Sequence, residues 1–241
     1  MANPLAQFQI HDIVPLPVGG LNLSYTNSSL LMTIAVVVST VFVVVGMRKR
    51  LLVPDRLQSM VEVFYEFIGT MVKDNIGADG KPYFAFIFSL FIFFLLGNLL
   101  GLVPYSFTFT SHLAVTLGMA VFIFLFTSAI GFARHGLHFF SLFLPGGAPL
   151  FLAPLLVPIE VLSYFMRPVS LGLRLFANMT AGHTLLKVFA GFVVSLGVAG
   201  VVPLAFVTAM MGLEVLVACL QAFVYTILTC IYLNDALHLH H

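Results

Sequence analysis

Several long stretches of this chain contain no charged side chain, among them residues 28–47, 83–103 and 113–133. An α-helix of about 20 apolar residues is long enough to cross the hydrocarbon core of a bilayer. Only 8% of the 241 residues are charged and 61% are hydrophobic, whereas a soluble domain has about 25% charged residues. These proportions exclude a soluble enzyme and a disordered chain. They predict an all-α, polytopic integral membrane protein with a single membrane domain.

The basic residues predict how the spans are oriented. Arg48, Lys49 and Arg50 directly follow the first stretch, and Arg134 follows the third. Loops rich in Lys and Arg stay on the cytoplasmic side of a membrane. Residues 1–27, which contain neither Lys nor Arg, are therefore expected outside, and the ends of the first and third spans inside.

The segment 54–74 differs from the spans because it contains charges. Apolar side chains recur along it at helical spacing, while Glu62, Glu66 and Lys73 occupy the other side. This pattern is typical of an amphipathic helix. We expect the helix to lie on the inner membrane surface or against other helices.

Two further apolar segments, residues 150–186 and 203–236, are too long for simple spans. As single helices they would measure about 55 and 50 Å, against a hydrocarbon core about 30 Å thick. Either both helices are strongly tilted or they are broken, for instance at Pro168. A break there would add a span and reverse the side of the C-terminus. Residues 188–202 are expected to connect the two segments near the outer face.

Five charged residues lie in these long segments, namely Glu160, Arg167, Arg174, Glu214 and Asp235, and the chief ones are Glu160, Arg174 and Glu214. A charge in the middle of a membrane costs about 2.5–3.5 kcal/mol on insertion scales, so such residues are candidate functional sites. The guanidinium of Arg174 stays charged at any physiological pH. It can form an electrostatic barrier but cannot relay a proton. The structural alternative is an arginine that reaches the interface or belongs to an ion pair.

Polar residues recur on one helix face in each long segment. They are Glu160, Arg167, Arg174, Asn178 and His183 in the first, and Glu214, Gln221, Tyr225 and Tyr232 in the second. Two facing polar stripes in a membrane indicate an aqueous path or a proton relay. Carboxylate and imidazole groups can both exchange protons near neutral pH. The alternative for His183 and Glu214 is a static, hydrogen-bonded pair.

Several kinds of site are not indicated. No cluster of carboxylates suggests a cation cage, no pattern for a nucleotide phosphate loop occurs, and the net charge of +1 gives no basic surface for nucleic acid. Cys219 and Cys230 would lie about 16 Å apart on a helix, which is too far for a disulfide. We therefore expect no metal, no cofactor and no direct binding of nucleotide.

The residues from Pro168 to His183, PVSLGLRLFANMTAGH, are similar to the signature of subunit a of F-type ATP synthases. The last helix of that family resembles Glu214 and the run Leu220–Tyr225, with Tyr232 near the end. Its second span resembles Gly97–Pro104. The resemblance extends from Phe8 to the C-terminus.

This resemblance implies a membrane stator beside a rotating ring of c subunits, each with one carboxylate. Peripheral-stalk b-type subunits, lipid and protons are the other implied partners. Two offset half-channels would lead to the ring, with Arg174 as the essential arginine between them. The implied outer half-channel residues are Asn178, His183, Glu214 and Gln221, and the implied inner ones are Glu160 and Tyr225. The resemblance favours five spans. It also favours a tilted hairpin for the last two helices rather than a break. The implied location is a bacterial inner membrane or, alternatively, a mitochondrial inner membrane.

One departure from the family pattern is informative. Many bacterial members have Glu at the position of His183 and His at the position of Glu214, so the two residue types are exchanged here. The exchange resembles the mitochondrial branch and its nearest bacterial relatives. Because either order keeps one acid and one imidazole, it favours a functional pair, and protons over sodium.

Two other classes of protein compete with this interpretation. A stand-alone, proton-coupled solute carrier would be expected to contain paired internal repeats, which the sequence lacks. A purely structural membrane scaffold leaves the buried charges of Arg174 and Glu214 unexplained.

Overall fold

The computed structural model describes residues 11–15, 17–18, 21–22, 24–48, 53–103, 107–143, 151 and 153–238. Lys49, Arg50 and Pro104 of the sequence analysis lie outside these ranges. Within them, five helices are long and apolar enough to cross a membrane, judged by length and composition. The prediction of an all-α polytopic membrane protein is confirmed.

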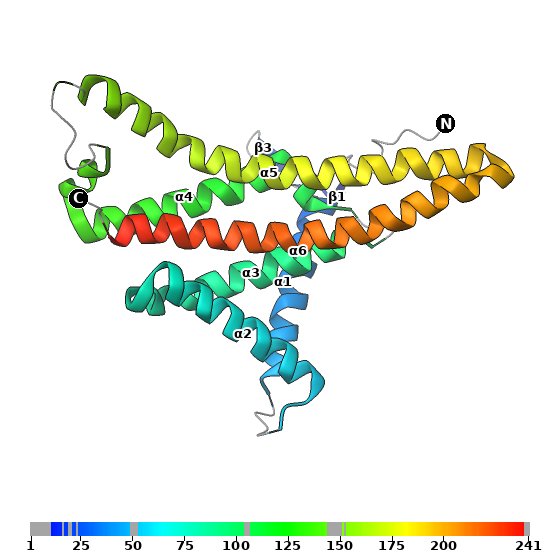
Figure 1. The fold of residues 1–241 in the computed structure, drawn as a ribbon, viewed down its shortest axis with the longest axis horizontal. Coiled ribbons are helices and arrows are strands. Elements are labelled where there is room, and N and C mark those ends of the chain that lie inside the picture. The colour runs from blue at the N-terminus through cyan, green and yellow to red at the C-terminus, as the bar shows by residue number, and fades with distance from the viewer. Residues whose placement is uncertain are drawn as a thin grey trace.

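The helices follow one another with short connections (Figure 1). In chain order they are α1 (Asn27–Gly46), α2 (Arg56–Asn75), α3 (Phe84–Gly101), α4 (Leu113–His135), α5 (Ala153–Ser195) and α6 (Val201–Leu237). The described connections contain the short 3-10 helices η2 (Gly77–Tyr83), η3 (Phe109–Ser111), η4 (Gly136–Phe143) and η6 (Gly197–Gly200).

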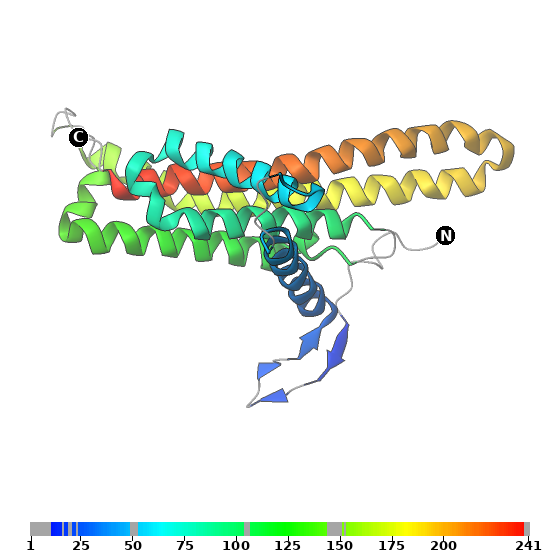
Figure 2. The ribbon, with the colours of Figure 1, turned by 90° about the horizontal axis from the view of Figure 1, so that it is seen from below.

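The segment before α1 contains short strands that the sequence analysis did not predict. β1 (Asp12–Val14) pairs antiparallel with β4 (Tyr25–Thr26), and β2 (Pro17–Val18) with β3 (Leu21–Asn22). Figure 2 shows them beyond the end of α1, away from the helical bundle. The side chain of Thr26 then begins α1 by accepting a hydrogen bond from the backbone N–H of Ser29.

The two longest helices form an antiparallel hairpin. α5 runs unbroken through Pro158 and Pro168, so the structure has no break at Pro168. Proline removes a helical hydrogen bond and commonly bends a helix, and Figure 1 shows α5 changing direction along its length. With 43 and 37 residues, α5 and α6 measure about 64 and 56 Å.

The connection between these helices is shorter than the sequence analysis expected. α5 continues to Ser195 instead of ending near residue 186, and α6 already begins at Val201. Gly191 is accommodated inside the helix, whereas Gly197 has a φ of +54°, a conformation that favours glycine and stops a helix. The turn therefore occupies only a few residues around η6.

The direction of α1 differs from that of the hairpin. Figures 1 and 2 both show α1 at a steep angle to the direction of α5 and α6, while α3 and α4 lie alongside them. α4 packs against both long helices and α3 packs against α6. If α1, about 30 Å long, stands across a bilayer, the hairpin must be strongly tilted.

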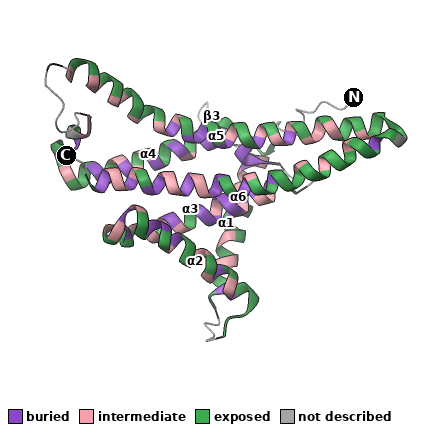
Figure 3. Ribbon diagram, viewed as in Figure 1, coloured by how far each residue is buried: buried purple, intermediate pink, exposed green. Residues whose placement is uncertain are grey.

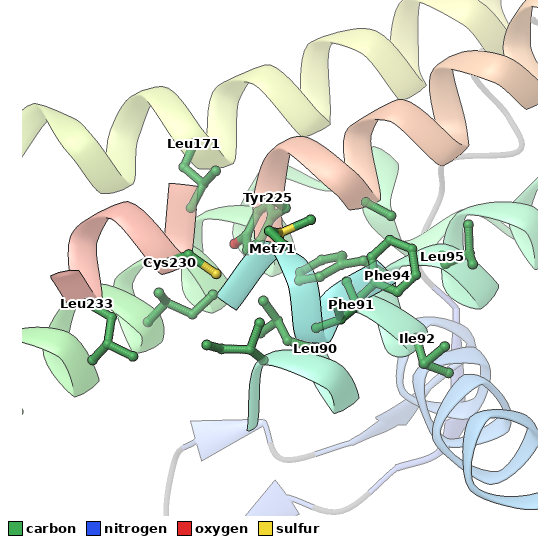
Figure 4. Packing of buried hydrophobic residues seen from close by; sticks show 14 of the residues in the cluster. Met71, Leu90, Phe91, Ile92, Phe94, Leu95, Leu171, Tyr225, Cys230 and Leu233 are labelled. Carbon is green, nitrogen blue, oxygen red and sulfur yellow. The ribbon is translucent and has the colours of Figure 1, made fainter. Parts of the chain in front are cut away.

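The core lies where α3, α6 and α2 meet (Figure 4). The ring centroids of Phe94 and Tyr225 lie 4.1 Å apart. Leu171 of α5 is also a buried member of this cluster. α2 belongs to this core, since its buried residues Ile68 and Met71 are part of the same cluster. The amphipathic helix therefore packs against other helices.

Much of the length of α1, α5 and α6 is exposed (Figure 3), and many of the exposed side chains are large and apolar. On α1 and the hairpin they include Val37, Val41, Leu162, Phe165, Leu213 and Leu216, all at least half exposed. Such a surface would be unusual for a soluble monomer, and it suits contact with lipid or with other membrane subunits.

Candidate functional site

A histidine and a glutamate meet inside the hairpin. Nδ1 of His183 on α5 lies 3.3 Å from Oε1 of Glu214 on α6, and the two side chains are only 11% and 5% exposed. The distance is that of an ion pair, although the geometry is not that of a hydrogen bond. The structure thus brings together the acid and the imidazole that the facing stripes predicted.

A glycine lets these helices approach at this point. A Cβ atom at Gly182 would lie 2.7 Å from Oε1 of Glu214, closer than real Cβ contacts. Only a residue without a side chain allows the carboxylate to lie against α5 beside His183.

The connection between α3 and α4 covers the pair from the other side. Oγ1 of Thr108 lies 2.9 Å from Nε2 of His183 and donates a hydrogen bond to the carbonyl of Gly101. One turn before His183, the hydroxyl of Thr180 donates to the carbonyl of Ser111. Thr108 was not among the residues predicted from the sequence. The available signal in the sequence was the group of hydroxyl residues Ser106, Thr108, Thr110 and Ser111 directly before His112, which could have indicated a polar site.

Several buried polar atoms around the pair lack a hydrogen-bond partner among the described residues. They are both carboxylate oxygens of Glu214, Oδ1 of Asn98, Oγ1 of Thr110, Oγ of Ser111 and Nε2 of His112. Buried polar groups normally find partners, and where protein groups are missing, ordered water supplies them. The region between α3, α5, α6 and η3 is therefore suited to hydration.

His112 lies just before α4 in this polar region. Burial lowers the pKa of its imidazole below the ordinary value, because an apolar environment disfavours the charged form. The ring stacks on Phe107 with a centroid distance of 4.7 Å.

Two further polar residues of α6 that the sequence pattern singled out also face the interior. Gln221 and Tyr225 are buried, and the hydroxyl of Tyr225 donates to the carbonyl of Thr116 on α4. The neighbouring amide of Asn98 donates to the carbonyl of Ala218. The interior polar set thus consists of His183, Glu214, Gln221 and Tyr225, and it extends toward α3 and α4.

Arg174 and Asn178 lie elsewhere, on the exposed face of α5. The guanidinium of Arg174 has no ion pair with any residue that the structure describes, although it is within electrostatic range of Tyr232. Glu160 is partly exposed nearer the start of α5. The structure therefore separates the candidate residues into an interior set and an exposed set, which the sequence pattern alone did not distinguish.

Arg167, two turns before Arg174, is held in place. Its Nη1 lies 2.7 Å from Oδ2 of Asp235, and its guanidinium lies 5.3 Å from the ring centroids of both Tyr164 and Tyr232. Cation–π contacts and an ion pair together fix such a group. Of these two arginines, only Arg174 remains available to an outside partner.

Further charges gather at the end of the bundle where α4 and α6 finish. Asp79 pairs with Arg134 at 2.9 Å and with His238 at 3.3 Å. Nowhere in the described ranges do three His, Cys, Asp or Glu side chains come together in a way that could hold a metal ion.

Comparison with known proteins shows the family of this chain. The family model described as ATP synthase A chain matches residues 29–234. ATP synthase subunit a of Paramagnetospirillum magneticum is 55% identical over 247 residues, covering 100% of each chain. The subunits a of Rhodospirillum rubrum and Pelagibacter ubique are 55% and 52% identical, over 100% and 99% of each chain. The chain therefore belongs to the ATP synthase A chain family, whose members are the proton-translocating membrane subunit of the synthase and not its catalytic part.

Proposed function

We propose that this chain is the stator that guides protons to and from a rotating ring of carboxylate-bearing c subunits. In this proposal two offset half-channels reach the ring, and Arg174 separates them. The observation that carries the proposal is the exposed guanidinium of Arg174, which has no ion pair among the described residues and lies on the same helix as His183 of the buried acid–imidazole pair.

The exposure of Arg174 argues for an anionic partner outside this chain. A lone charge in the hydrocarbon region is costly, and the neighbouring Asp235 is already paired with Arg167. A ring carboxylate that passes along the exposed face of α5 would supply the missing negative charge. The permanent charge of the guanidinium would keep that carboxylate ionised and repel a proton moving directly between the half-channels.

Positions along α5 support an offset of the two paths. His183 lies about 13 Å from Arg174 in one direction along the helix, and Glu160 about 21 Å in the other. In the proposal Asn178, His183, Glu214 and Gln221 form the outer half-channel, while Glu160 and Tyr225 belong to the inner one. The hydratable region around η3 would be its outer entrance.

The same proposal places the chain in an energy-coupling membrane. The relatives described above are bacterial, and together with the apolar helices they point to a bacterial inner membrane. The basic Arg48–Arg50 run would put the N-terminus outside and the C-terminus inside. A subunit of ATP synthase works within a complex, and we assign the c-ring and the peripheral-stalk b-type subunits as its contacts.

Reconstitution tests the proposal against a stand-alone carrier. Liposomes containing this chain together with the c-ring and the b-type subunits should conduct protons under an imposed potential. The drive is about 2.3 kcal/mol per charge for 100 mV. Liposomes with the chain alone should not conduct. Equal proton flux without the ring would contradict the stator proposal and favour a carrier.

Gly182 offers a second test within the site. Gly182→Ala should displace the Glu214 carboxylate, which is the flexible end of its side chain, so the protein should still fold. We expect proton pumping by the complete synthase to fall about tenfold, the equivalent of about 1.4 kcal/mol. The measurement is ATP-driven acidification of vesicles.

Gly191→Ala is the matched control for this change. Gly191 lies in the same helix, but a Cβ atom there would meet nothing within 4 Å. This variant should pump normally. Equal losses in both variants would mean that helix α5 simply does not tolerate alanine, and the close approach at Gly182 would have no special role.

A further inference from the structure

One threonine in the connection between α3 and α4 contacts the buried imidazole from the side opposite Glu214. We propose that Thr108 is a positioning residue, which fixes the ring of His183 so that only Nδ1 exchanges protons. The inference rests on the proposed role of the His183–Glu214 pair in the proton path. No part of the sequence signature around Arg174 contains this threonine.

The hydrogen bonds around Thr108 determine where the proton on His183 lies. A hydroxyl group has one hydrogen and two lone pairs. The carbonyl of Gly101, 3.0 Å away, can only accept, so the hydroxyl hydrogen of Thr108 points to it. Thr108 therefore offers a lone pair to Nε2 of His183 at 2.9 Å. Nε2 must carry a hydrogen to satisfy this contact.

The consequence concerns the opposite nitrogen. With Nε2 protonated, the neutral ring presents an unprotonated Nδ1 toward Oε1 of Glu214. Uptake of a proton creates the imidazolium by forming an N–H bond at Nδ1. Transfer to Glu214 breaks that bond, leaves its electron pair on Nδ1 and forms an O–H bond on the carboxylate. The hydrogen on Nε2 stays where it is throughout.

Thr108 cannot itself pass the proton on. Its hydroxyl group has a single hydrogen, which it donates in a hydrogen bond to the backbone carbonyl of Gly101. A backbone carbonyl is too weakly basic to accept the proton itself. The imidazole therefore does not relay protons by taking one up at Nε2 and releasing one at Nδ1. Protons enter and leave on the side of Glu214, where both carboxylate oxygens are buried without hydrogen-bond partners among the described residues.

Burial and packing hold this arrangement in place. Thr108 is 5% exposed, so bulk water does not replace its hydroxyl. A Cβ atom at Gly101 would lie 2.6 Å from the Cγ2 methyl of Thr108, so glycine is needed for the threonine to fit. Among the described residues, the charged groups that interact with the ring are Glu214 on α6 and Lys187 one turn along α5, and His112 lies on the same connection as Thr108.

The test compares three variants of the complete synthase in liposomes. Thr108→Val keeps the shape but removes the hydroxyl, and should lower ATP-driven proton pumping about three- to tenfold, as expected for one lost hydrogen bond. Thr108→Ser keeps the hydroxyl and should retain pumping. Thr127→Val is the matched control, because Thr127 is a buried threonine of α4 whose hydroxyl donates to carbonyls of its own helix.

A nitrogen-15 NMR spectrum of histidine-labelled synthase in liposomes supplies the direct readout. The His183 signal is the one absent from His183→Gln. In the neutral ring Nε2 should be protonated and Nδ1 not, and Thr108→Val should populate the other tautomer. A protonated Nδ1 in the neutral wild-type ring would overturn the inference.

The pumping results can overturn it as well. Equal pumping by Thr108→Val and Thr127→Val would do so, as would a loss in Thr108→Ser as large as that in Thr108→Val. Glu214→Gln in the same preparation shows whether wild-type pumping depends on Glu214. If it does, either of these outcomes contradicts the role of Thr108 alone and leaves the proposed function intact.

Discussion

Arg174→Ala is expected to abolish ATP-driven proton pumping by the synthase. Without the guanidinium, a ring carboxylate passing the exposed face of α5 loses its counter-charge. At about 4 Å and an effective dielectric constant of about 20, that interaction amounts to roughly 4 kcal/mol, or about a thousandfold in rate. The measurement is acidification of vesicles after addition of ATP, in membranes containing equal amounts of assembled complex.

Arg134→Ala is the control for loss of an arginine from this chain. Arg134 pairs with Asp79, but both side chains are nearly half exposed, and such surface pairs contribute little. This variant should pump as the wild type does. Full coupled pumping by Arg174→Ala would refute the assignment of Arg174 as the barrier between the half-channels.

The exchange of the buried pair has the second largest expected effect. His183→Glu alone places two carboxylates about 3 Å apart, and Glu214→His alone places two imidazoles there. Like groups at this distance cannot both hold their charge, so each single variant should lose most of its proton flux. The double variant restores one acid and one imidazole, and should pump clearly better than either single change.

A second acid–imidazole contact provides the control for this exchange. His238 and Asp79 also lie 3.3 Å apart, but their side chains are more than 40% exposed. Exchanging these two residues should leave pumping unchanged, singly or together. A double variant at 183 and 214 that pumps no better than the worse single variant would show that the two groups do not act as a pair.

The helices and the central pair could be predicted from sequence for simple physical reasons. The uncharged stretches of about 20 residues can only be buried in a membrane, and the observed α1, α3 and α4 correspond to them. His183 and Glu214 were expected to face each other because polar residues on one side of each long apolar helix avoid lipid by facing one another.

Other features depend on contacts that a sequence pattern does not contain. Residues spaced seven apart lie on one face of a helix, but the spacing does not indicate which neighbouring helix, if any, packs on that face. Gln221 and Tyr225 are covered by α3 and α4, whereas Arg174 and Asn178 are left exposed. Thr108 could not be assigned either, because its role comes from the folding of a short connection onto α5. The end of α5 was missed because Gly191 and Gly197 are equally strong signals in sequence, and only the second has a positive φ.

Cysteine crosslinking tests the central claim most directly, namely that the exposed face of α5 around Arg174 lies against the rotor. Ala177 is exposed next to this arginine, whereas Met179 is fully buried. The exposed Cys219 is first replaced by serine so that it does not react. In the assembled synthase, Ala177→Cys should then crosslink to a small subunit that carries the ring carboxylate, and Met179→Cys should not. Recovery of only lipid adducts, or of a second copy of this chain, would contradict the account.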